Sequence, residues 1–291
     1  MAEQKRVCLV TGERGFLGTH IMKEALGQGL EPRGLGEIRL PGAEIHELVR
    51  SVNPDVVVHL AGPASVASSI SDPRDDFVGT VSGTASLLEA VRLYAPRARF
   101  VYASSAAVYG AVEHLPISED APIRPISPYG YHKAMAEQLV EEAAKIFGLW
   151  TVTARIFSAY GVGLHRQVVY DLCVKASRGQ SLILDGDGSQ SRDFIHVKDV
   201  VRALLLLVER GQGRGERYNV ASGVETSIGA LGKLIAASFG VDAPRFSMQG
   251  RAGDPPRWRA DMSRTASLGF VCEVPIEQGI GETAEWVRAQ C

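Results

Sequence analysis

The chain lacks the cysteine and metal-ligand patterns of disulfide-rich and zinc-binding proteins. Its 291 residues include only four cysteines, at positions 8, 173, 272 and 291. They are far apart, form no CxxC pair and have no cluster of other metal ligands around them. This spacing argues against a structural zinc site and suits a reducing compartment such as the cytosol.

Long apolar runs and an excess of one charge are also missing. The longest apolar run, 203–208, is far shorter than the ~20 residues of a transmembrane helix, and the N-terminus has no apolar signal-peptide core. The formal charge is only -2, from 31 basic and 33 acidic residues mixed along the chain. No overall field therefore attracts nucleic acid or an anionic membrane, and we expect a cytoplasmic protein that binds neither.

Hydrophobic residues are plentiful, at 45% of the chain, which is enough for one large domain or two unequal ones. Short apolar runs predict strands at 7–10, 31–35, 56–58, 99–103 and 150–157. Helical patterns lie between or beside them, most clearly at 43–52, 77–94 and 128–147. Strands that alternate with helices in this way predict an α/β fold with a doubly wound parallel sheet of the Rossmann type.

The first predicted strand leads directly into a glycine-rich turn, TGERGFLG. Gly12, Gly15 and Gly18 fit a dinucleotide-binding turn, because glycine tolerates positive φ and lets a pyrophosphate approach the backbone. The helix that follows would direct its positive N-terminal end at that group. The simpler alternative is a tight turn between strand and helix with no ligand.

The end of the second predicted strand bears on the choice of cofactor. Dinucleotide folds usually place a carboxylate there to hold the adenosine ribose, and Gly36 occupies that place here. Arg14 lies in the glycine turn and Arg39 just beyond the strand, so guanidinium groups could meet a 2'-phosphate, which favours NADP. Two alternatives stay open: the arginines are solvated surface residues, or Glu37 holds the ribose of NAD.

A tyrosine and a lysine four residues apart are the candidate acid–base pair. Tyr129 and Lys133 share one face of the helix predicted at 128–147, so the ammonium could favour the ionised phenol. The motif SSAAVYG begins where the strand at 99–103 ends. Ligands of open parallel sheets lie at such C-terminal strand ends, so Ser105 is well placed to hydrogen-bond a substrate oxygen. His59, inside the VVVH run, is better explained as a packed strand residue than as a metal ligand.

With these residues assembled, the chain resembles the extended short-chain dehydrogenase/reductase family, in its nucleotide-sugar branch. The motifs that carry the resemblance span nearly the whole chain: TGERGFLG, PDVVVHLAG, SSAAVYG, YGYHK, RIFSAYG, RDFIHVKDV, YNVASG and RAGDPPRWRADMSRTASLGF. The resemblance implies a dinucleotide-binding domain at 1–162 and 196–223, and a smaller lobe for the nucleotide sugar at 163–195 and 224–291. It also implies a homodimer joined through the helices at about 77–94 and 128–147.

The resemblance also implies roles for individual residues. Tyr129 would be the catalytic acid/base, Lys133 would bind the nicotinamide ribose, and Ser105 would polarise the carbonyl or alkoxide. Implied cofactor-binding residues are Gly12, Arg14, Gly15, Phe16, Leu17, Gly18, Glu37, Arg39, Leu60, Ala61, Gly62, Tyr129, Lys133 and Ile156. Implied substrate-binding residues are Ser65, Ser105, Ser158, Arg192 and Arg251.

Arg192 and Arg251 match the positions that bind the diphosphate of the sugar nucleotide in this family. A planar guanidinium fork suits that bidentate task. The alternative for each arginine is a salt bridge, to Asp193 or to Asp254 respectively.

Departures from the family pattern narrow the expected activity. Ala106 and Ala107 stand where the 4,6-dehydratases carry acids, so no carboxylic acid is at hand to eliminate the 6-hydroxyl. Ser158 and Thr80 replace two asparagines, and the short link after the second strand resembles the 4-keto-6-deoxysugar reductases.

We therefore expect NADPH-dependent reduction of a nucleotide-linked 4-keto sugar. The main alternative is an NAD-dependent nucleotide-sugar 4-epimerase. A further alternative, from a different class, is a catalytically silent NADP-binding regulator.

Overall fold

A six-stranded parallel sheet forms the centre of the molecule. The computed structural model describes residues 5–249 and 257–290. Across the sheet the strands run in the order β2 (Leu30–Gly34), β1 (Arg6–Thr11), β3 (Val56–His59), β4 (Arg99–Ser105), β5 (Thr151–Ile156) and β9 (Arg214–Val220). Every neighbouring pair is parallel. The predicted Rossmann-type α/β fold is thus confirmed.

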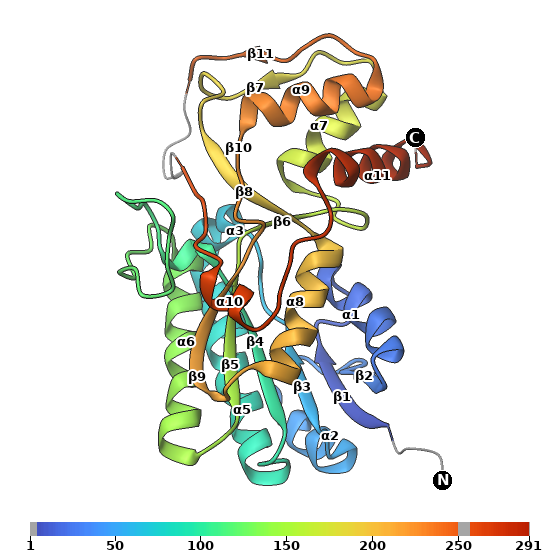
Figure 1. Cartoon of the computed structure of the whole chain (residues 1–291). Coiled ribbons are helices and arrows are strands. Elements are labelled where there is room, and N and C mark those ends of the chain that lie inside the picture. The colour runs from blue at the N-terminus through green and yellow to red at the C-terminus, as the bar shows by residue number, and fades with distance from the viewer. Residues whose placement is uncertain (1–4, 250–256, 291) are drawn as a thin grey trace.

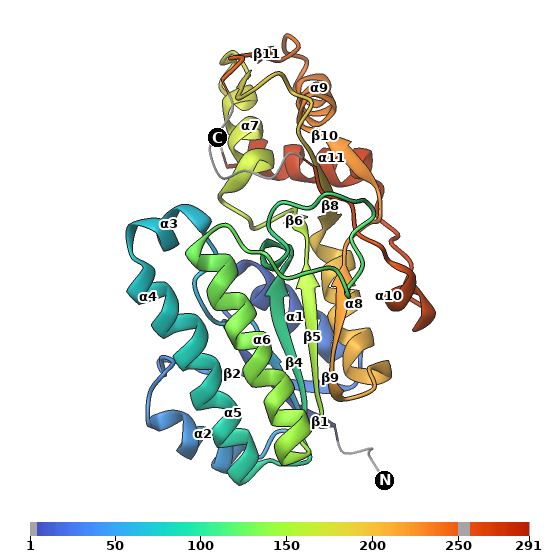
Figure 2. The same ribbon diagram turned by 90° about the vertical axis from the view of Figure 1, so that its left-hand side faces the viewer.

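Helices cover both faces of this sheet (Figure 1). One layer holds α1 (Phe16–Gly27) and α8 (Val197–Arg210), and the other holds α2 (Glu44–Val52), α5 (Gly83–Tyr94) and α6 (Pro128–Phe147). Figure 2 shows α5 and α6 side by side with α4 (Pro73–Phe77), which follows α3 (Val66–Ser71). The π-helix η1 (Val78–Ser82) joins α4 to α5, and the short 3-10 helix η2 (Ala106–Val108) follows β4.

Alternation along the strands divides the core between the two faces. Cys8 and Val10 pack toward α1 and α8, whereas Leu9 packs toward α2, α5 and α6. Because both faces are covered, the central strands read as continuous apolar runs, as in VVV at 56–58. The strand order reverses beside β1, since β2 lies on one side of it and β3 on the other. The C-terminal ends of β1 and β3 are therefore the expected ligand position.

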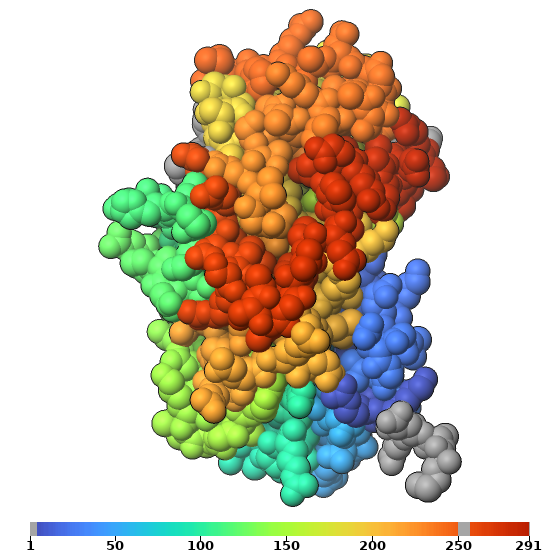
Figure 3. Space-filling view, viewed as in Figure 1, coloured from blue at the N-terminus to red at the C-terminus, as the bar shows by residue number. Residues whose placement is uncertain are grey.

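The remaining elements pack around a separate core above this sheet. They are a three-stranded sheet of β10 (Glu225–Ser227), β8 (Ser191–His196) and β6 (Ser158–Tyr160), the pair β11 (Arg245–Phe246) and β7 (Ile183–Leu184), and helices α7 (Gln167–Ser177), α9 (Ile228–Phe239) and α11 (Ile276–Arg288). The C-terminal stretch, red in Figure 3, passes between the two parts and includes α10 (Ser263–Ser267). The assignment of this upper part to the nucleotide sugar stays a prediction.

Two predicted elements differ from what the sequence pattern indicated. The helix predicted at 77–94 begins earlier, at Pro73, because the side chain of Asp72 accepts a hydrogen bond from the Asp75 amide and caps α4. The strand predicted at 150–157 ends at Ile156, and Ser158 starts β6, which pairs with β8 instead.

The helix predicted at 128–147 is present over that whole range. Ser127 accepts a hydrogen bond from the Gly130 amide at 3.2 Å, and Gly148 ends the helix with φ of 68°. In the part of the chain that the structure describes, no helix is both long and apolar enough to cross a membrane.

Asp193 holds the two parts of the chain together at β8. Its side chain is fully buried, and its Oδ1 accepts from the backbone and hydroxyl of Ser222 at 2.8 and 2.7 Å. Its Oδ2 accepts from the amides of Gly223 and Ala260, each at 3.0 Å. One carboxylate thus satisfies donors from the loop after β9 and from the segment before α10.

We predict that Asp193→Asn lowers the free energy of unfolding by about 2–5 kcal/mol, since each buried donor left without an acceptor costs ~1–3 kcal/mol. The Asn amide group would face two N–H or O–H donors wherever it points. Denaturant unfolding of Asp193→Asn should show this loss, with the exposed Asp242→Asn as the matched control. Equal stability of the two variants would contradict the structural role of Asp193.

Candidate active site

The glycine turn lies tightly against the end of β3. Gly12 has φ of +70°, and a Cβ on it would come within 3.0 Å of the Ala61 backbone nitrogen. A Cβ on Gly18, in the first turn of α1, would fall 2.0 Å from the carbonyl oxygen of Gly12. Only glycine fits these two places. The turn therefore packs closely between α1 and β3, and its glycine backbone with the N-terminus of α1 fits the pyrophosphate of a dinucleotide.

Other predicted cofactor residues lie at the start of α1 and at the C-terminal ends of the strands. Gly15, Phe16 and Leu17 form the start of α1, while Leu60, Ala61 and Gly62 follow β3 directly. Ile156 is the last residue of β5. All of these residues lie at the C-terminal edge of the parallel sheet, as predicted.

A buried chain of hydrogen bonds runs beneath the turn. The hydroxyl of Thr11 accepts from the Ala61 amide and lies 2.7 Å from Nδ1 of His59, so it donates to that nitrogen. Nε2 of His59 then donates to the Thr84 hydroxyl at 3.0 Å, and Thr84 donates to the carbonyl of Thr80 at 2.6 Å.

This arrangement needs a neutral imidazole, and burial lowers the pKa of His59 to about 3. His59 is therefore a packed strand residue, as predicted. Among residues 5–249 and 257–290, no group of His, Cys, Asp or Glu side chains is placed to hold a metal ion.

Ser105, Tyr129 and Lys133 converge at the end of β4. The side chain of Ser105, the last residue of that strand, lies close enough to the Tyr129 phenol to affect its pKa. Lys133, one turn further along α6, places Nζ 5.8 Å from the centroid of the Tyr129 ring and donates to the Ala103 carbonyl at 3.0 Å. The structure thus brings the three predicted catalytic side chains into one group.

Burial affects the protonation of both Tyr129 and Lys133. It raises the pKa of Tyr129, and the neighbouring Ser105 side chain opposes this only in part. Burial also lowers the pKa of Lys133 to about 8. The expectation that the Lys133 ammonium favours an ionised Tyr129 stays a prediction, and such an effect would have to oppose the burial of the phenol.

Asp76 is a charged neighbour of this group that the sequence did not indicate. It lies on α4 and is only 2% exposed, with Oδ2 at 2.6 Å from Nδ1 of His132 on α6. Its negative charge raises the pKa of Lys133 and so opposes the effect of burial. The sequence did not predict the effect of Asp76 on Lys133, because this effect depends on the packing of α4 against α6 rather than on any sequence motif.

A buried ion pair supports the strand that carries Ser105. Arg155 on β5 contacts Glu137 on α6 through its Nε and Nη2 atoms, and both side chains are almost fully buried. The same carboxylate accepts from the hydroxyl of Ser104 at 2.6 Å. Glu137 on α6 therefore fixes this helix against β4 and β5 next to Ser105.

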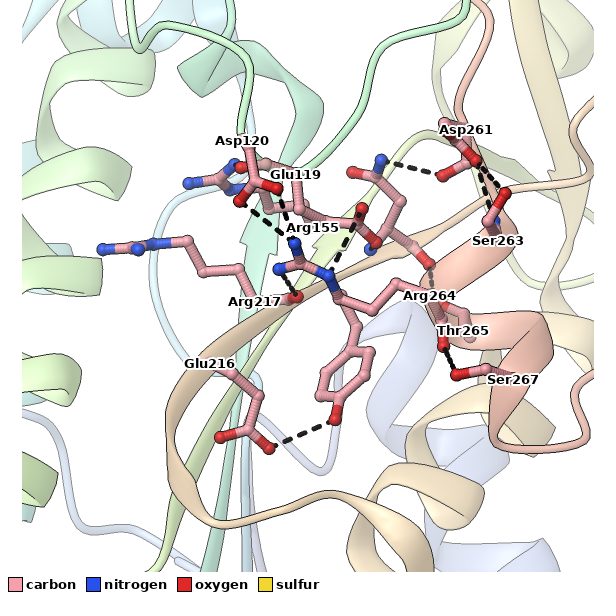
Figure 4. Close-up of polar contacts among 12 residues, drawn as sticks. Glu119, Asp120, Arg155, Glu216, Arg217, Asp261, Ser263, Arg264, Thr265 and Ser267 are labelled. Atoms are coloured by element: carbon pink, nitrogen blue, oxygen red, sulfur yellow. Dashed lines mark hydrogen bonds and ion pairs between the residues drawn. The ribbon is translucent and has the colours of Figure 1, made fainter.

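Polar contacts also anchor the segment that follows η2 (Figure 4). The backbone amide of Asn219 donates to Oε1 of Glu119 at 2.9 Å, and the Arg155 side chain donates to the Glu119 backbone carbonyl at 2.9 Å. Arg264 on α10 contacts both oxygens of Asp120, at 3.0 and 2.9 Å. The segment between Ser105 and α6 is thus tied to β5, β9 and α10.

Arginine and glutamate side chains form ion pairs at the end of β2, where the adenosine part of the cofactor is predicted to bind. Arg14 forms a 2.6 Å ion pair with Glu37, and both side chains are exposed. Arg33, at the end of β2, pairs with Glu31. Arg39 lies close enough to Glu37 to lower the pKa of that carboxyl, although Arg14 contributes more. The guanidinium of Arg14, which suggested NADP, is therefore matched here by a carboxylate.

The predicted substrate residues other than Ser105 and Arg251 occupy three separate elements. Ser65 caps α3 by accepting from the Ser68 amide at 3.1 Å, and Ser158 begins β6. Arg192 on β8 is largely buried, donates to the carbonyl of Ser191, and lies 5.4 Å from the ring centroid of Trp258. Arg251 lies outside the described residues. The roles of these residues in substrate binding stay predictions.

Comparison with known proteins defines the class. Residues 8–221 match the model of the NAD dependent epimerase/dehydratase family, which covers most of the chain. The chain is 32% identical over 310 residues to the UDP-glucose 4-epimerase of Mycolicibacterium smegmatis, with 96% of this chain and 98% of that protein covered. The chain belongs to the NAD dependent epimerase/dehydratase family.

Solved structures agree with this assignment. The UDP-glucose 4-epimerase of Thermotoga maritima, solved with UDP-glucose, superposes with a TM-score of 0.90 at 29% identity, covering 98% of this chain and 99% of that one. The UDP-glucose 4-epimerase of Thermus thermophilus, solved with NAD, gives a TM-score of 0.89 at 28% identity, covering 98% and 100%. These relatives match the epimerase alternative better than the 4-ketoreductase that the sequence first suggested.

We predict that Asp76→Asn lowers the pKa of Lys133 below its value of about 8, because the variant loses a negative charge that favours the ammonium. Lys133 is charged below that pKa and neutral above it, so Asp76→Asn extends the neutral form to lower pH. NMR titration of protein with ¹³C-labelled lysine, with the Lys133 signal assigned by Lys133→Met, measures this directly. The exposed neighbour Asp75→Asn is the control and should leave the titration unchanged. A Lys133 that titrates at the same pH in both variants would contradict the coupling.

Proposed function

We propose that the protein is an NAD-dependent 4-epimerase of a nucleotide-diphosphate sugar. The observation that carries the proposal is the group of Ser105, Tyr129 and Lys133 at the sheet edge, followed by Ala106 and Ala107 with no added acid. This set can move one proton to and from one oxygen. It has no second acid–base group for an elimination.

NAD, when bound at the glycine turn, would accept a hydride from the sugar C4 and return it to the same carbon. The side chains of this chain handle the proton. Tyr129, ionised beside the positive charge of Lys133, takes the proton of the 4-hydroxyl as the hydride leaves and gives it back when the hydride returns on the other face. Ser105 donates a hydrogen bond to the oxygen in the 4-keto state, and Lys133 binds the nicotinamide ribose and keeps a positive charge near the phenol.

Two features favour an epimerase over a dehydratase or a reductase. Ala106 is buried and Ala107 is small, so neither can protonate a leaving 6-hydroxyl. The Arg14 guanidinium, the main reason to expect NADPH, is paired with Glu37. A reductase consumes one hydride per turnover and must exchange its cofactor, whereas an epimerase regenerates it. A site with carboxylates at the adenosine end suits NAD that stays bound.

The nucleotide sugar would lie over the C-terminal strand ends, with its diphosphate on Arg192 and Arg251. Buried Arg192 is held in place by the Ser191 carbonyl and by the Trp258 ring, which suits bidentate recognition of phosphate. UDP-glucose is the first substrate to test, since relatives are named for it.

We also propose a homodimer joined through α5 and α6. These helices expose apolar side chains on one side of the molecule: Leu93, Tyr94, Tyr131, Met135, Ile146 and Phe147. Exposed apolar residues gathered in this way mark association surfaces.

The parent should sediment at about twice its mass of 31.3 kDa, and the double variant Met135→Glu, Ile146→Glu should sediment as a monomer. Val271→Glu, at an equally exposed site elsewhere, is the control and should stay dimeric. A monomeric parent would refute this dimer.

For the reaction itself, we predict that purified protein contains about one NAD per subunit and interconverts UDP-glucose and UDP-galactose without net change in absorbance at 340 nm. Tyr129→Phe should lose turnover by ~10²- to 10⁴-fold, as expected when a general acid/base is removed, and should keep its NAD. Tyr131→Phe, an exposed tyrosine two residues along α6, should be unaffected.

The competing reductase predicts a different result. That enzyme would contain no stoichiometric NAD and would oxidise NADPH in the presence of a 4-keto nucleotide sugar. This outcome would overturn the epimerase assignment, whereas normal turnover of Tyr129→Phe would remove Tyr129 from either mechanism.

A further inference from the structure

Glu13, inside the glycine turn, directs its side chain across to the end of β2. Its Oε1 accepts a hydrogen bond from the Gly36 amide at 3.1 Å. Its Cγ, Cδ and Oε1 atoms lie 2.5, 2.7 and 2.9 Å from the place where a Cβ on Gly34 would be. The carboxylate therefore lies directly over the last residue of β2, although it comes from the loop after β1.

Two glycines at the end of β2 make this arrangement possible. Gly34 has no side chain to occupy the space that Glu13 fills. Gly36, with φ of +64°, turns the chain away after the strand and brings its own N–H to Glu13. The strand end that lacks an acid of its own is thus the one that receives a carboxylate from the neighbouring loop.

The ion pairs around this carboxylate are made by its neighbours. Arg14 pairs with Glu37 at 2.6 Å, although it is near enough for the charge of Glu13 also to raise the pKa of Arg14, and Arg33 pairs with Glu31. Within the described part of the chain, Glu13 accepts its hydrogen bond from Gly36 through Oε1, which leaves Oε2 as the acceptor for a ligand. Glu13 is half-buried, which limits the screening of its charge by solvent.

We propose that Glu13 binds the hydroxyls of the adenosine ribose and makes the site selective for NAD over NADP. The proposal rests on the proposed function in one respect, namely that the cofactor is a nicotinamide dinucleotide bound at the glycine turn. A carboxylate accepts hydrogen bonds from a ribose diol, and it repels a phosphate on the same sugar. Glu13 would take the part that Glu37 was expected to play, and Glu37 would neutralise Arg14.

The position of Glu13 also explains why Gly36 is compatible with NAD. In dinucleotide folds the ribose acid generally follows the second strand, about 20 residues after the glycine turn. Here the last residue of β2 is paired in register with Val10 of β1, so a side chain only three residues beyond Val10 reaches the same edge. The carboxylate at the end of β2 thus comes from Glu13 in the loop after β1, and not from the loop after β2.

Direct binding of NADH and NADPH to cofactor-free protein, followed by nicotinamide fluorescence, tests the proposal without relying on turnover. The parent should bind NADH at least about 10-fold more tightly than NADPH, as expected for one hydrogen-bonded charge. Glu13→Gln keeps the acceptor for Gly36 but removes the charge, and it should reduce this preference to about 3-fold or less. The double variant Arg14→Ala, Glu37→Gln is the matched control: it removes the other carboxylate together with the guanidinium that this carboxylate neutralises, and it should retain at least the preference of the parent.

A second variant moves the Glu13 carboxylate away from the end of β2 without removing it from the chain. Gly34→Ala places a methyl group where the Glu13 side chain lies, so it should displace Glu13 and weaken the preference for NADH as Glu13→Gln does. Thermal unfolding of each variant confirms that it is folded before binding is compared.

The possible results distinguish a wrong assignment of Glu13 from a wrong proposed function. If the parent prefers NADH but Glu13→Gln keeps that preference and the Arg14→Ala, Glu37→Gln variant loses it, Glu37 is the ribose acid and the assignment of Glu13 is overturned. If the parent prefers NADPH, both the assignment of Glu13 and the NAD-dependent function fail. If the parent prefers NADH but shows no epimerase activity, the assignment of Glu13 can stand while the proposed reaction fails.

Discussion

The close approach of the glycine turn to the end of β3 is the constraint on which the rest of the site depends. Gly12 and Gly18 leave no space for side chains between the turn, α1 and β3. This contact fixes the N-terminus of α1 next to β1 and β3, where the strand order reverses. The buried hydrogen bonds from Thr11 through His59 to Thr84 then fix the position of α5, which packs beside α6. The acid–base group and the dinucleotide turn are thereby placed on one edge of one sheet.

Much of this architecture was predictable because it rests on local signals. Apolar runs bounded by glycine identified the central strands, and Ser127 with Pro128 identified the start of α6. The spacing of Tyr129 and Lys133 predicted their common face, and the position of Ser105 after a buried strand predicted that it would join them. Each of these inferences needed only neighbours in sequence and the general rule for parallel sheets.

The features that could not be predicted depend on packing between distant segments. Asp76 influences Lys133 only because α4 lies against α6, and no motif marks it. The raised pKa of Tyr129 could not be predicted either, because spacing reports a nearby cation but not the cost of burying a charge. At the adenosine end, the sequence showed a missing acid at Gly36 but not that Glu13 fills the space over Gly34.

The anchoring of the segment after η2 has a consequence for how the protein acquires its site during synthesis. Asp120 is held by Arg264, 144 residues further along the chain, and Asn219 meets Glu119 across 100 residues. Chains emerge from the ribosome N-terminus first, and contacts of such long separation form late because their loops are costly to close. The strands and helices up to α6 can therefore assemble early, but the segment beside Ser105 reaches its final position only after α10 has been made. The last tenth of the chain thus completes a candidate site whose predicted proton-transfer residues were all synthesised in its first half.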